Sequence, residues 1–188
     1  MREPLVLASR SPQRRAILEQ LGIDFRVEPA DVEEETSGNP RSLVTENALR
    51  KARAVDGDLV LGADTEVHLD GRIFGKPETE AEARTLLHRL SGRTHEVWGG
   101  IALRTATGDE RTAVAVTKVR FALIEPPLLD WYLASDEWRD RAGGYAIQGR
   151  GAALVDSIEG DFWNVVGLPV PELLELAPGL LQAARSAQ

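Results

Sequence analysis

The stretch from Leu7 to Ala16, LASRSPQRRA, combines several groups that bind anions. Ser11 followed by Pro12 predicts the start of a helix, because a serine caps free backbone N–H groups and proline is pre-set for the first helical position. Three arginines crowd this positively polarised end: Arg10, Arg14 and Arg15. Backbone N–H groups, the Ser9 and Ser11 hydroxyls and an arginine would together form a phosphate cradle. Alternatively, the arginines are solvated and Ser11 is only a cap.

A carboxylate ends the apolar run DLVLGAD at residues 58–64. Sheets that contain parallel strands bind ligands at the carboxyl ends of these strands, so Asp64 is a candidate functional group, although it could equally cap a turn. The acidic run DVEEE includes Glu33, Glu34 and Glu35. One of these carboxylates could join Asp64 around a cation, for which magnesium or manganese suits oxygen ligands best. The other interpretation is a solvated acidic loop.

Two glycine-containing stretches add further candidates. GRIFGKP at residues 71–77 is not a P-loop, because the glycine spacing is one residue short and Pro77 replaces the magnesium-binding Ser or Thr. Lys76 is then either a phosphate contact or an ordinary surface lysine. In AGGYAIQGRG, residues 142–151, the Gln148 amide could read the edge of a nucleobase, or the stretch is only a tight loop.

Short strands and amphipathic helices must position these residues. Strands are predicted at residues 5–8, 25–28, 58–64, 96–104, 112–123 and 153–158, with a hairpin around Asp70-Gly71. Helices are predicted from Pro12 to about Gly22, from Pro40, over 79–90 and 126–134, and from Pro171 with an interruption at Pro178. Lys51 points toward the covered face of the second helix. This mixture predicts a single α/β or α+β domain with a mixed sheet.

Composition excludes several classes of function. The 188 residues carry a formal net charge of −8 and include no long basic block, which argues against a nucleic acid or an anionic membrane as partner. The sequence contains no cysteine, so disulfides, thiolate metal sites and cysteine nucleophiles are excluded. The three histidines lack metal-ligand spacing. No signal peptide or membrane span is recognisable, and we expect a cytoplasmic protein.

Taken together, the stretches resemble the Maf family of nucleotide pyrophosphatases. The similarity runs in order through LASRSPQRRAILEQLGI, DVEEE, ENALRKARA, LGADT, LDGRIFGKPETEAEARTLLHRLSGRTHEV and DRAGGYAIQGRGAALVDSIEGDFWNVVGLP. It implies one Maf-like domain over residues 1–188, with an elongated, inosine-triphosphatase-like α/β fold and a cleft between two lobes. It also implies hydrolysis of a nucleoside triphosphate to the monophosphate and pyrophosphate, a divalent cation such as Mg²⁺ or Mn²⁺, and a homodimer.

The resemblance also implies roles for individual residues. The general base of the family falls on Asp64, with Lys51 and Lys76 as further catalytic residues. Phosphate contacts fall on Ser9, Ser11 and Arg14, and metal ligands on Glu34 and Asp64. Base selection falls on Gln13, Thr65 and Gln148. A triphosphate, with about four negative charges, would give the scattered cations a common partner.

The choice of base is where this chain departs from the family pattern. Members acting on dTTP and UTP usually read SPRR where this chain has SPQRR, and members acting on 7-methyl-GTP usually have tryptophan at position 13. ADT and YAIQG resemble the dTTP/UTP branch, which we therefore favour. Three alternatives remain: a 7-methyl-GTP pyrophosphatase, a nucleotide-binding regulator of cell division without turnover, and an aspartyl-phosphate phosphomonoesterase, for which Glu66 would be the second acid.

Overall fold

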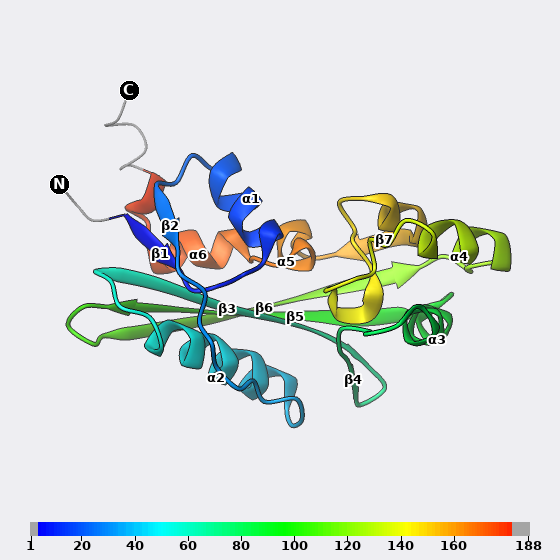
Figure 1. Ribbon diagram of the computed structural model, residues 1–188, viewed down its shortest axis with the longest axis horizontal. Helices are drawn as coiled ribbons and strands as arrows, with labels where there is room; N and C mark the ends of the chain where they lie inside the picture. The colour runs from blue at the N-terminus through cyan, green and yellow to red at the C-terminus, as the bar shows by residue number, and fades with distance from the viewer. Residues whose placement is uncertain (1–3, 182–188) are drawn as a thin grey trace.

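The computed structural model describes residues 4–181 of the chain (Figure 1). The strands are β1 (Leu5–Leu7), β2 (Phe25–Val27), β3 (Leu59–Leu69), β4 (Arg72–Phe74), β5 (Thr94–Thr105), β6 (Glu110–Phe121) and β7 (Val155–Glu159). The α-helices are α1 (Pro12–Gln20), α2 (Pro40–Arg53), α3 (Glu80–Leu90), α4 (Pro126–Leu133), α5 (Phe162–Val166) and α6 (Val170–Leu176). Two 3₁₀ helices, η1 (Ala142–Gly144) and η2 (Arg150–Leu154), precede β7.

All strands belong to one seven-stranded mixed sheet with the order β2-β1-β3-β5-β6-β7, and β4 pairs with β3. β1 runs parallel to both β2 and β3, whereas every other pair is antiparallel. The predicted mixed α/β fold is confirmed.

Helices cover both faces of the sheet at one end of the molecule. α2 lies on one face, and α1, α5 and α6 lie on the other (Figure 1). α2 packs unusually close to the sheet: a Cβ atom added to Gly62 would lie 2.0 Å from the Ala48 carbonyl oxygen, and one added to Gly100 would lie 2.4 Å from that of Val44. Glycine at these two strand positions therefore allows the helix that carries Lys51 to contact the backbone of the sheet.

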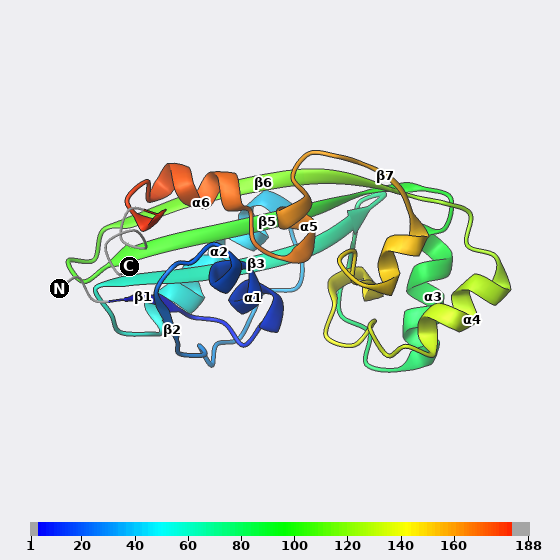
Figure 2. The same cartoon turned by 90° about the horizontal axis from the view of Figure 1, so that it is seen from above.

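The molecule is elongated, because β3, β5 and β6 extend beyond these helices into a second lobe (Figure 2). There they pack with α3, α4 and the 3₁₀ segments around a separate apolar cluster that includes Leu87, Tyr132 and Trp138. In the first lobe, one cluster lies beneath α1 and α6 and another beneath α2. The long shared strands join the lobes and form the floor between them.

The structure corrects the expected extent of one strand and adds one helix. The strand predicted to end at Asp64 continues to Leu69, so Asp64 lies in its middle. The residues after Asp64 were assigned to a separate hairpin arm, but they continue the same pairing with β5 and reach the predicted Asp70-Gly71 turn. The helix α5 was not predicted, because its five residues are too few to show a periodicity.

Local capping follows the sequence closely. Ser11 accepts a hydrogen bond from the Arg14 backbone N–H, and Asn39 caps α2. Thr79 caps α3 by accepting from the Glu82 backbone N–H, while the Glu82 carboxylate accepts from Glu78 N–H rather than from the cap residue. None of the described helices is long and apolar enough to cross a membrane.

Candidate active site

A cleft of about 760 Å³ lies between the two lobes. Every site residue predicted from the sequence lines it: Ser9, Ser11, Gln13, Arg14, Glu34, Lys51, Asp64, Thr65, Lys76 and Gln148. These residues come from both ends of the fold, so the tertiary structure brings together groups that are up to 139 positions apart in the sequence.

The position of the cleft follows from the pairing along one edge of β3. β1 pairs with this strand at Val60 and Leu61, and β4 pairs with it from Val67 onward. Residues 62–66 therefore have no strand partner on one side in the described part of the chain. Because side chains alternate along a strand, Asp64 and Glu66 project from one face of the sheet and Thr65 from the other. All three reach the cleft at this open edge.

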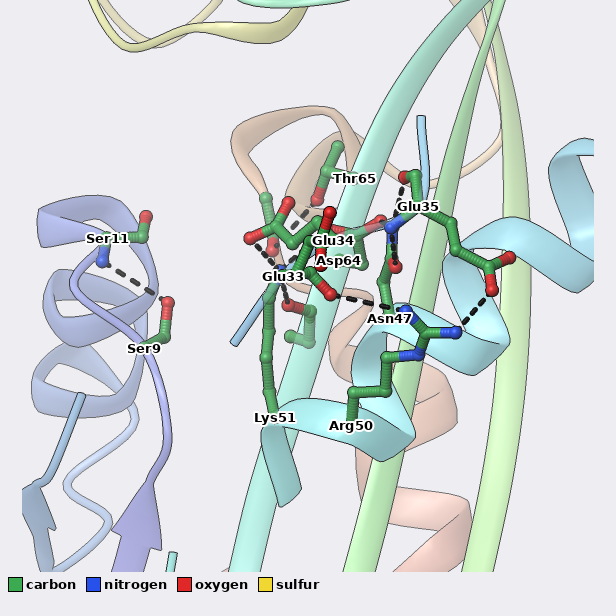
Figure 3. Close-up of polar contacts among 12 residues, drawn as sticks. Ser9, Ser11, Glu33, Glu34, Glu35, Asn47, Arg50, Lys51, Asp64 and Thr65 are labelled. Carbon is green, nitrogen blue, oxygen red and sulfur yellow. Dashed lines mark hydrogen bonds and ion pairs between the residues drawn. The ribbon is translucent and has the colours of Figure 1, made fainter. Parts of the chain in front are cut away.

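Asp64 is held by two donors from α2 (Figure 3). Its Oδ1 accepts a hydrogen bond from Lys51 Nζ at 2.8 Å, and its Oδ2 accepts one from Asn47 Nδ2 at 3.0 Å. Asp64 and Lys51 are only 4% and 7% exposed, so this ion pair lies almost entirely out of bulk water. The orientation of the carboxylate is therefore fixed by side chains one turn apart on a single helix.

Lys51 also connects Asp64 to the acidic loop. Its Nζ lies 2.9 Å from Glu34 Oε1 and donates a hydrogen bond to the Ala63 carbonyl oxygen at 3.2 Å. Asn47 fixes the adjoining backbone, accepting from the Glu35 N–H at 2.8 Å and donating to the Glu35 carbonyl oxygen at 2.9 Å. Of the three consecutive glutamates, Glu34 is the one that lines the cleft, and Glu35 forms an ion pair with Arg50.

Arg14 occupies the other side of the open edge and is 8% exposed. Its guanidinium donates from Nε to the Gly167 carbonyl oxygen at 2.8 Å, from Nη1 to Ser9 Oγ at 3.0 Å and from Nη2 to Thr65 Oγ1 at 3.1 Å. Burial lowers the pKa of Arg14, and the nearby Asp64 and Glu34 charges partly oppose this. Arg14 thus links α1, β3 and the loop after α5.

The three arginines of the opening stretch do not all reach the cleft. Arg15 is exposed and pairs with Glu19 one helical turn further on, at 2.8 Å. Arg10 lines the cleft but is exposed and lies 3.9 Å from Asp31. Arg15 therefore has a protein partner away from the cleft, whereas Arg10 and Arg14 line it.

Glu66 is a third acidic group in the cleft. Burial raises its pKa to about 7, helped by the negative charges of Asp64 and Glu34 and opposed by Lys76 and Lys51. The carboxyl group is consequently divided between its protonated and ionised forms near neutral pH. Within residues 4–181, no group of three or more acidic or histidine side chains is close enough to enclose a metal ion.

The second lobe contributes exposed polar groups. Lys76 lies on the turn after β4, and Gln148 lies on the loop between η1 and η2. Gln13 lines the cleft from α1, and its Oε1 accepts a hydrogen bond from the Ser11 hydroxyl at 3.0 Å. Of the candidate base-selecting residues, Gln13 thus lies in the first lobe, Gln148 in the second and Thr65 on the shared strand β3.

The sequence did not single out Asn47 or Arg141, and it treated Glu66 only as part of an alternative function. Asn47 precedes Lys51 by four residues, so helical spacing could have placed both on one face. Glu66 follows Asp64 by two residues, which puts both on one face of a strand once that strand is known to continue. Arg141 has no comparable local pattern.

Comparison with known proteins gives the family. The profile described as Maf-like protein matches residues 4–179. The chain belongs to the Maf-like protein family. Relatives of this Maf-like chain named dTTP/UTP pyrophosphatase include one from an Anaeromyxobacter species, 49% identical, with 92% of this chain and 87% of the relative covered. One from Symbiobacterium thermophilum is 48% identical, and the match covers 93% of this chain and 92% of the relative. One from Pyrococcus furiosus is 44% identical, and the match covers 92% of this chain and 93% of the relative.

Among solved structures, a HAM1 protein from Coxiella burnetii matches this Maf-like chain with a TM-score of 0.46 and 20% identity, covering 80% of this chain and 90% of the other.

Proposed function

We propose that this chain hydrolyses a nucleoside triphosphate, dTTP or UTP by preference, to the monophosphate and pyrophosphate. The observation that carries the proposal is the convergence of Asp64, Lys51 and Arg14 with Lys76 in one cleft. Relatives named dTTP/UTP pyrophosphatase over nine-tenths of the chain support the same reaction.

Asp64 acts as the general base in this proposal. Its carboxylate takes a proton from a water molecule whose oxygen attacks the α-phosphorus. The new bond joins that oxygen to the α-phosphorus, and the bond from the α-phosphorus to the oxygen that bridges to the β-phosphorus breaks. Pyrophosphate leaves with the electron pair. Lys51 and Asn47 keep the carboxylate oriented, because each holds one of its oxygens.

The cations of both lobes neutralise the phosphates. Lys51 and Arg14 provide fixed positive charge at the floor, where low exposure strengthens electrostatic interactions, and Lys76 approaches from the second lobe. Ser9 adds a hydroxyl donor next to the N-terminus of α1. Ser11 lines the cleft beside it as a second proposed phosphate contact, although its hydroxyl donates to Gln13 Oε1 in this structure.

The acidic groups fit a divalent cation of the magnesium type. Mg²⁺ is usually held by one or two protein carboxylates together with substrate phosphates. Glu34 and Asp64 would be two such ligands, since both already contact one cation, Lys51 Nζ. When bound, Mg²⁺ or Mn²⁺ would supply positive charge for the phosphate oxygens.

Base selection is assigned to Gln13, Thr65 and Gln148. Amide side chains can both donate to and accept from the edge of a pyrimidine. Ser11 holds the Gln13 carbonyl oxygen, which favours presentation of the amide NH₂ group to the ligand. Thr65 Oγ1 accepts a hydrogen bond from Arg14, which fixes the position of this side chain at the cleft.

A product assay tests the function. The purified protein is incubated with Mg²⁺ and either dTTP, UTP or 7-methyl-GTP, and released pyrophosphate and orthophosphate are measured separately. We expect pyrophosphate from dTTP and UTP. Pyrophosphate only from 7-methyl-GTP would favour the second branch of the family, and orthophosphate would favour the phosphomonoesterase. Nucleotide binding without any product would favour the regulator.

The remaining expectations belong to the same proposal. We propose one Maf-like domain over residues 1–188, a homodimer, a cytoplasmic location and a small-molecule partner rather than a nucleic acid or membrane. Light scattering coupled to size exclusion measures the oligomeric state, and a monomeric mass would refute the dimer.

A further inference from the structure

Arg141 is a cleft residue whose charge has no ion-pair partner within residues 4–181. It lines the cleft from the second lobe, immediately before η1, and is half-buried. Its Nε is buried and makes no hydrogen bond, and the side chain forms no ion pair with any residue between 4 and 181. Burial lowers its pKa, while Tyr132, Asp140 and Glu137 act on it only at longer range. A buried N–H group without an acceptor is unusual in folded proteins.

The two basic residues at the floor of the cleft differ from Arg141 in this respect. Arg14 donates to three protein oxygens, and Lys51 contacts two carboxylates and a carbonyl oxygen. Much of their hydrogen-bonding capacity therefore stabilises the site itself. A strongly anionic ligand in the cleft needs donors that the protein has not already used, and the second lobe supplies them.

The backbone around Arg141 is fixed beside the turn that carries Lys76. The Gly143 N–H donates to the Gly75 carbonyl oxygen at 3.1 Å, and the Gly144 N–H donates to the carbonyl oxygen of Arg141 at 3.0 Å. Gly143 has φ of 70°, and a Cβ atom there would lie 3.0 Å from a Val67 methyl group. Only glycine adopts this left-handed backbone conformation without strain in so closely packed a position. The packing and the hydrogen bond to Gly75 hold the loop of Arg141 against the turn that carries Lys76.

We propose that Arg141 binds the phosphate chain of the nucleotide from the second lobe. Its Nε and an Nη N–H form a fork that matches two oxygens of a phosphate, which would give the buried Nε its missing acceptor. With Lys76 on the adjoining loop, Arg141 completes a cationic wall opposite Arg14 and Lys51. The inference rests on the function proposed above, because it takes the cleft as a nucleotide site.

Inorganic pyrophosphate tests this role without any turnover. Its dissociation constant is measured by titration calorimetry in the presence of Mg²⁺ for the wild type, Arg141→Met, Arg141→Lys and the control Arg139→Met. Arg139 lines the same cleft and carries the same charge, but it already has partners: its guanidinium lies 4.3 Å over the Trp138 ring and 3.1 Å from Asp136. Far-UV circular dichroism and urea unfolding establish that each variant is folded.

We expect Arg141→Met to weaken pyrophosphate binding by about 10- to 100-fold, which is the effect of losing charge-assisted hydrogen bonds to an anion. Arg141→Lys recovers only part of this loss, because an ammonium group cannot form the fork. Arg139→Met changes binding by less than about threefold, the range of a screened, exposed charge. Equal effects of Arg141→Met and Arg139→Met would overturn the proposal.

The two proposals fail separately. If the wild type releases pyrophosphate from dTTP but Arg141→Met binds pyrophosphate normally, Arg141 has no phosphate role and the proposed reaction stands. If the wild type has no activity on any nucleotide but Arg141→Met still weakens pyrophosphate binding, the reaction is wrong and the anion-binding role of Arg141 stands.

Discussion

At the scale of single residues, the proposed reaction depends on the ion pair between Asp64 and Lys51. Asp64→Asn keeps the shape of the side chain but removes its ability to take a proton from water. We expect kcat with dTTP to fall by about 10³-fold, within the range for loss of a general base, with a much smaller change in KM. Steady-state kinetics measures both constants.

Asp31→Asn is the matched control for this variant. Asp31 lines the same cleft, and its replacement by asparagine removes the same charge. Its only ion pair within residues 4–181 is the exposed contact with Arg10. We expect its kcat to stay within about threefold of wild type, since exposed ion pairs contribute little. An Asp64→Asn protein as active as Asp31→Asn would refute the role of Asp64 as base.

Lys51 contributes to stability as well as to charge in the cleft. Lys51→Met leaves Asp64 as a buried carboxylate next to Glu34 with no cation between them. We expect the free energy of unfolding at pH 7.5 to fall by about 3 kcal/mol, as for removal of one partner of a buried ion pair. Urea unfolding measures the loss. Adding Asp64→Asn to Lys51→Met should restore much of it, and a double variant less stable than either single variant contradicts this account.

The sequence predicted the charged residues of the site better than the residues that hold them. Asp64, Lys51 and Arg14 belong to recognisable motifs, and all three line the cleft. Asn47 stabilises Asp64 through an amide whose importance depends on the close packing of α2 against β3. The unpartnered Nε of Arg141 is visible only when both lobes are in place. Local patterns carry no information about such long-range contacts.

At the scale of elements, the sequence predicted the caps and the long helices, because these depend on nearby residues. Ser11, Asn39 and Thr79 each cap the helix that follows. The predicted length of β3 was wrong, because the first part of the strand is buried on both faces whereas burial alternates along the second part. A change in periodicity suggested two elements, but the tertiary structure continues one strand from the first lobe into the second.

The contact between α2 and the sheet gives a prediction at this scale. In Gly62→Ala, the new methyl group would lie 2.0 Å from the Ala48 carbonyl oxygen, so α2 must move outward together with Asn47 and Lys51. We expect a loss of about 1–3 kcal/mol in the free energy of unfolding, the usual cost of overpacking. Because both donors to Asp64 move, kcat should also fall.

Gly75→Ala is the stability control, because a Cβ atom there meets nothing within 4 Å. Urea unfolding of the two variants compares a close helix–sheet contact with an open loop position. If both lose the same stability, the effect comes from the loss of glycine itself and not from the packing of α2. A Gly62→Ala protein with wild-type stability and kcat would show that α2 can shift without moving the donors to Asp64.

At the scale of the whole molecule, three long strands run through two separate apolar cores and along the cleft between them. β3, β5 and β6 enter both lobes, so the floor of the cleft is continuous backbone rather than a hinge between independent parts (Figure 2). The walls are loops and helix ends, which are free to carry polar residues. Stability of either core therefore affects the geometry of the cleft through the shared strands.

The second core makes the stability of the whole chain depend on pH. His95 on β5 is 1% exposed and packs edge-to-face against the rings of both Phe121 and Tyr145, and its Nε2 shares a 2.9 Å hydrogen bond with the Tyr145 hydroxyl. Burial lowers the pKa of His95 to about 4. The folded protein therefore holds His95 neutral, whereas the unfolded chain binds a proton below its ordinary pKa of 6.5.

The sign of the effect follows from this difference. The stabilisation by neutral His95 is complete above pH 6.5 and is lost as the pH falls toward 4, because only the unfolded state gains the proton. Between pH 7.5 and 5 the expected loss is about 2 kcal/mol. Glu66 acts in the opposite direction over part of this range, since its raised pKa of about 7 makes the folded state bind the extra proton.

Comparison with His95→Gln separates the two groups, because the variant retains Glu66 and has no titratable group at position 95. Urea unfolding of both proteins at pH 7.5 and pH 5 gives four free energies. The wild type should lose about 2 kcal/mol more than His95→Gln between these pH values, since the contribution of Glu66 cancels in the difference. Equal losses in the two proteins would mean that His95 binds its proton as readily in the folded core as in the unfolded chain.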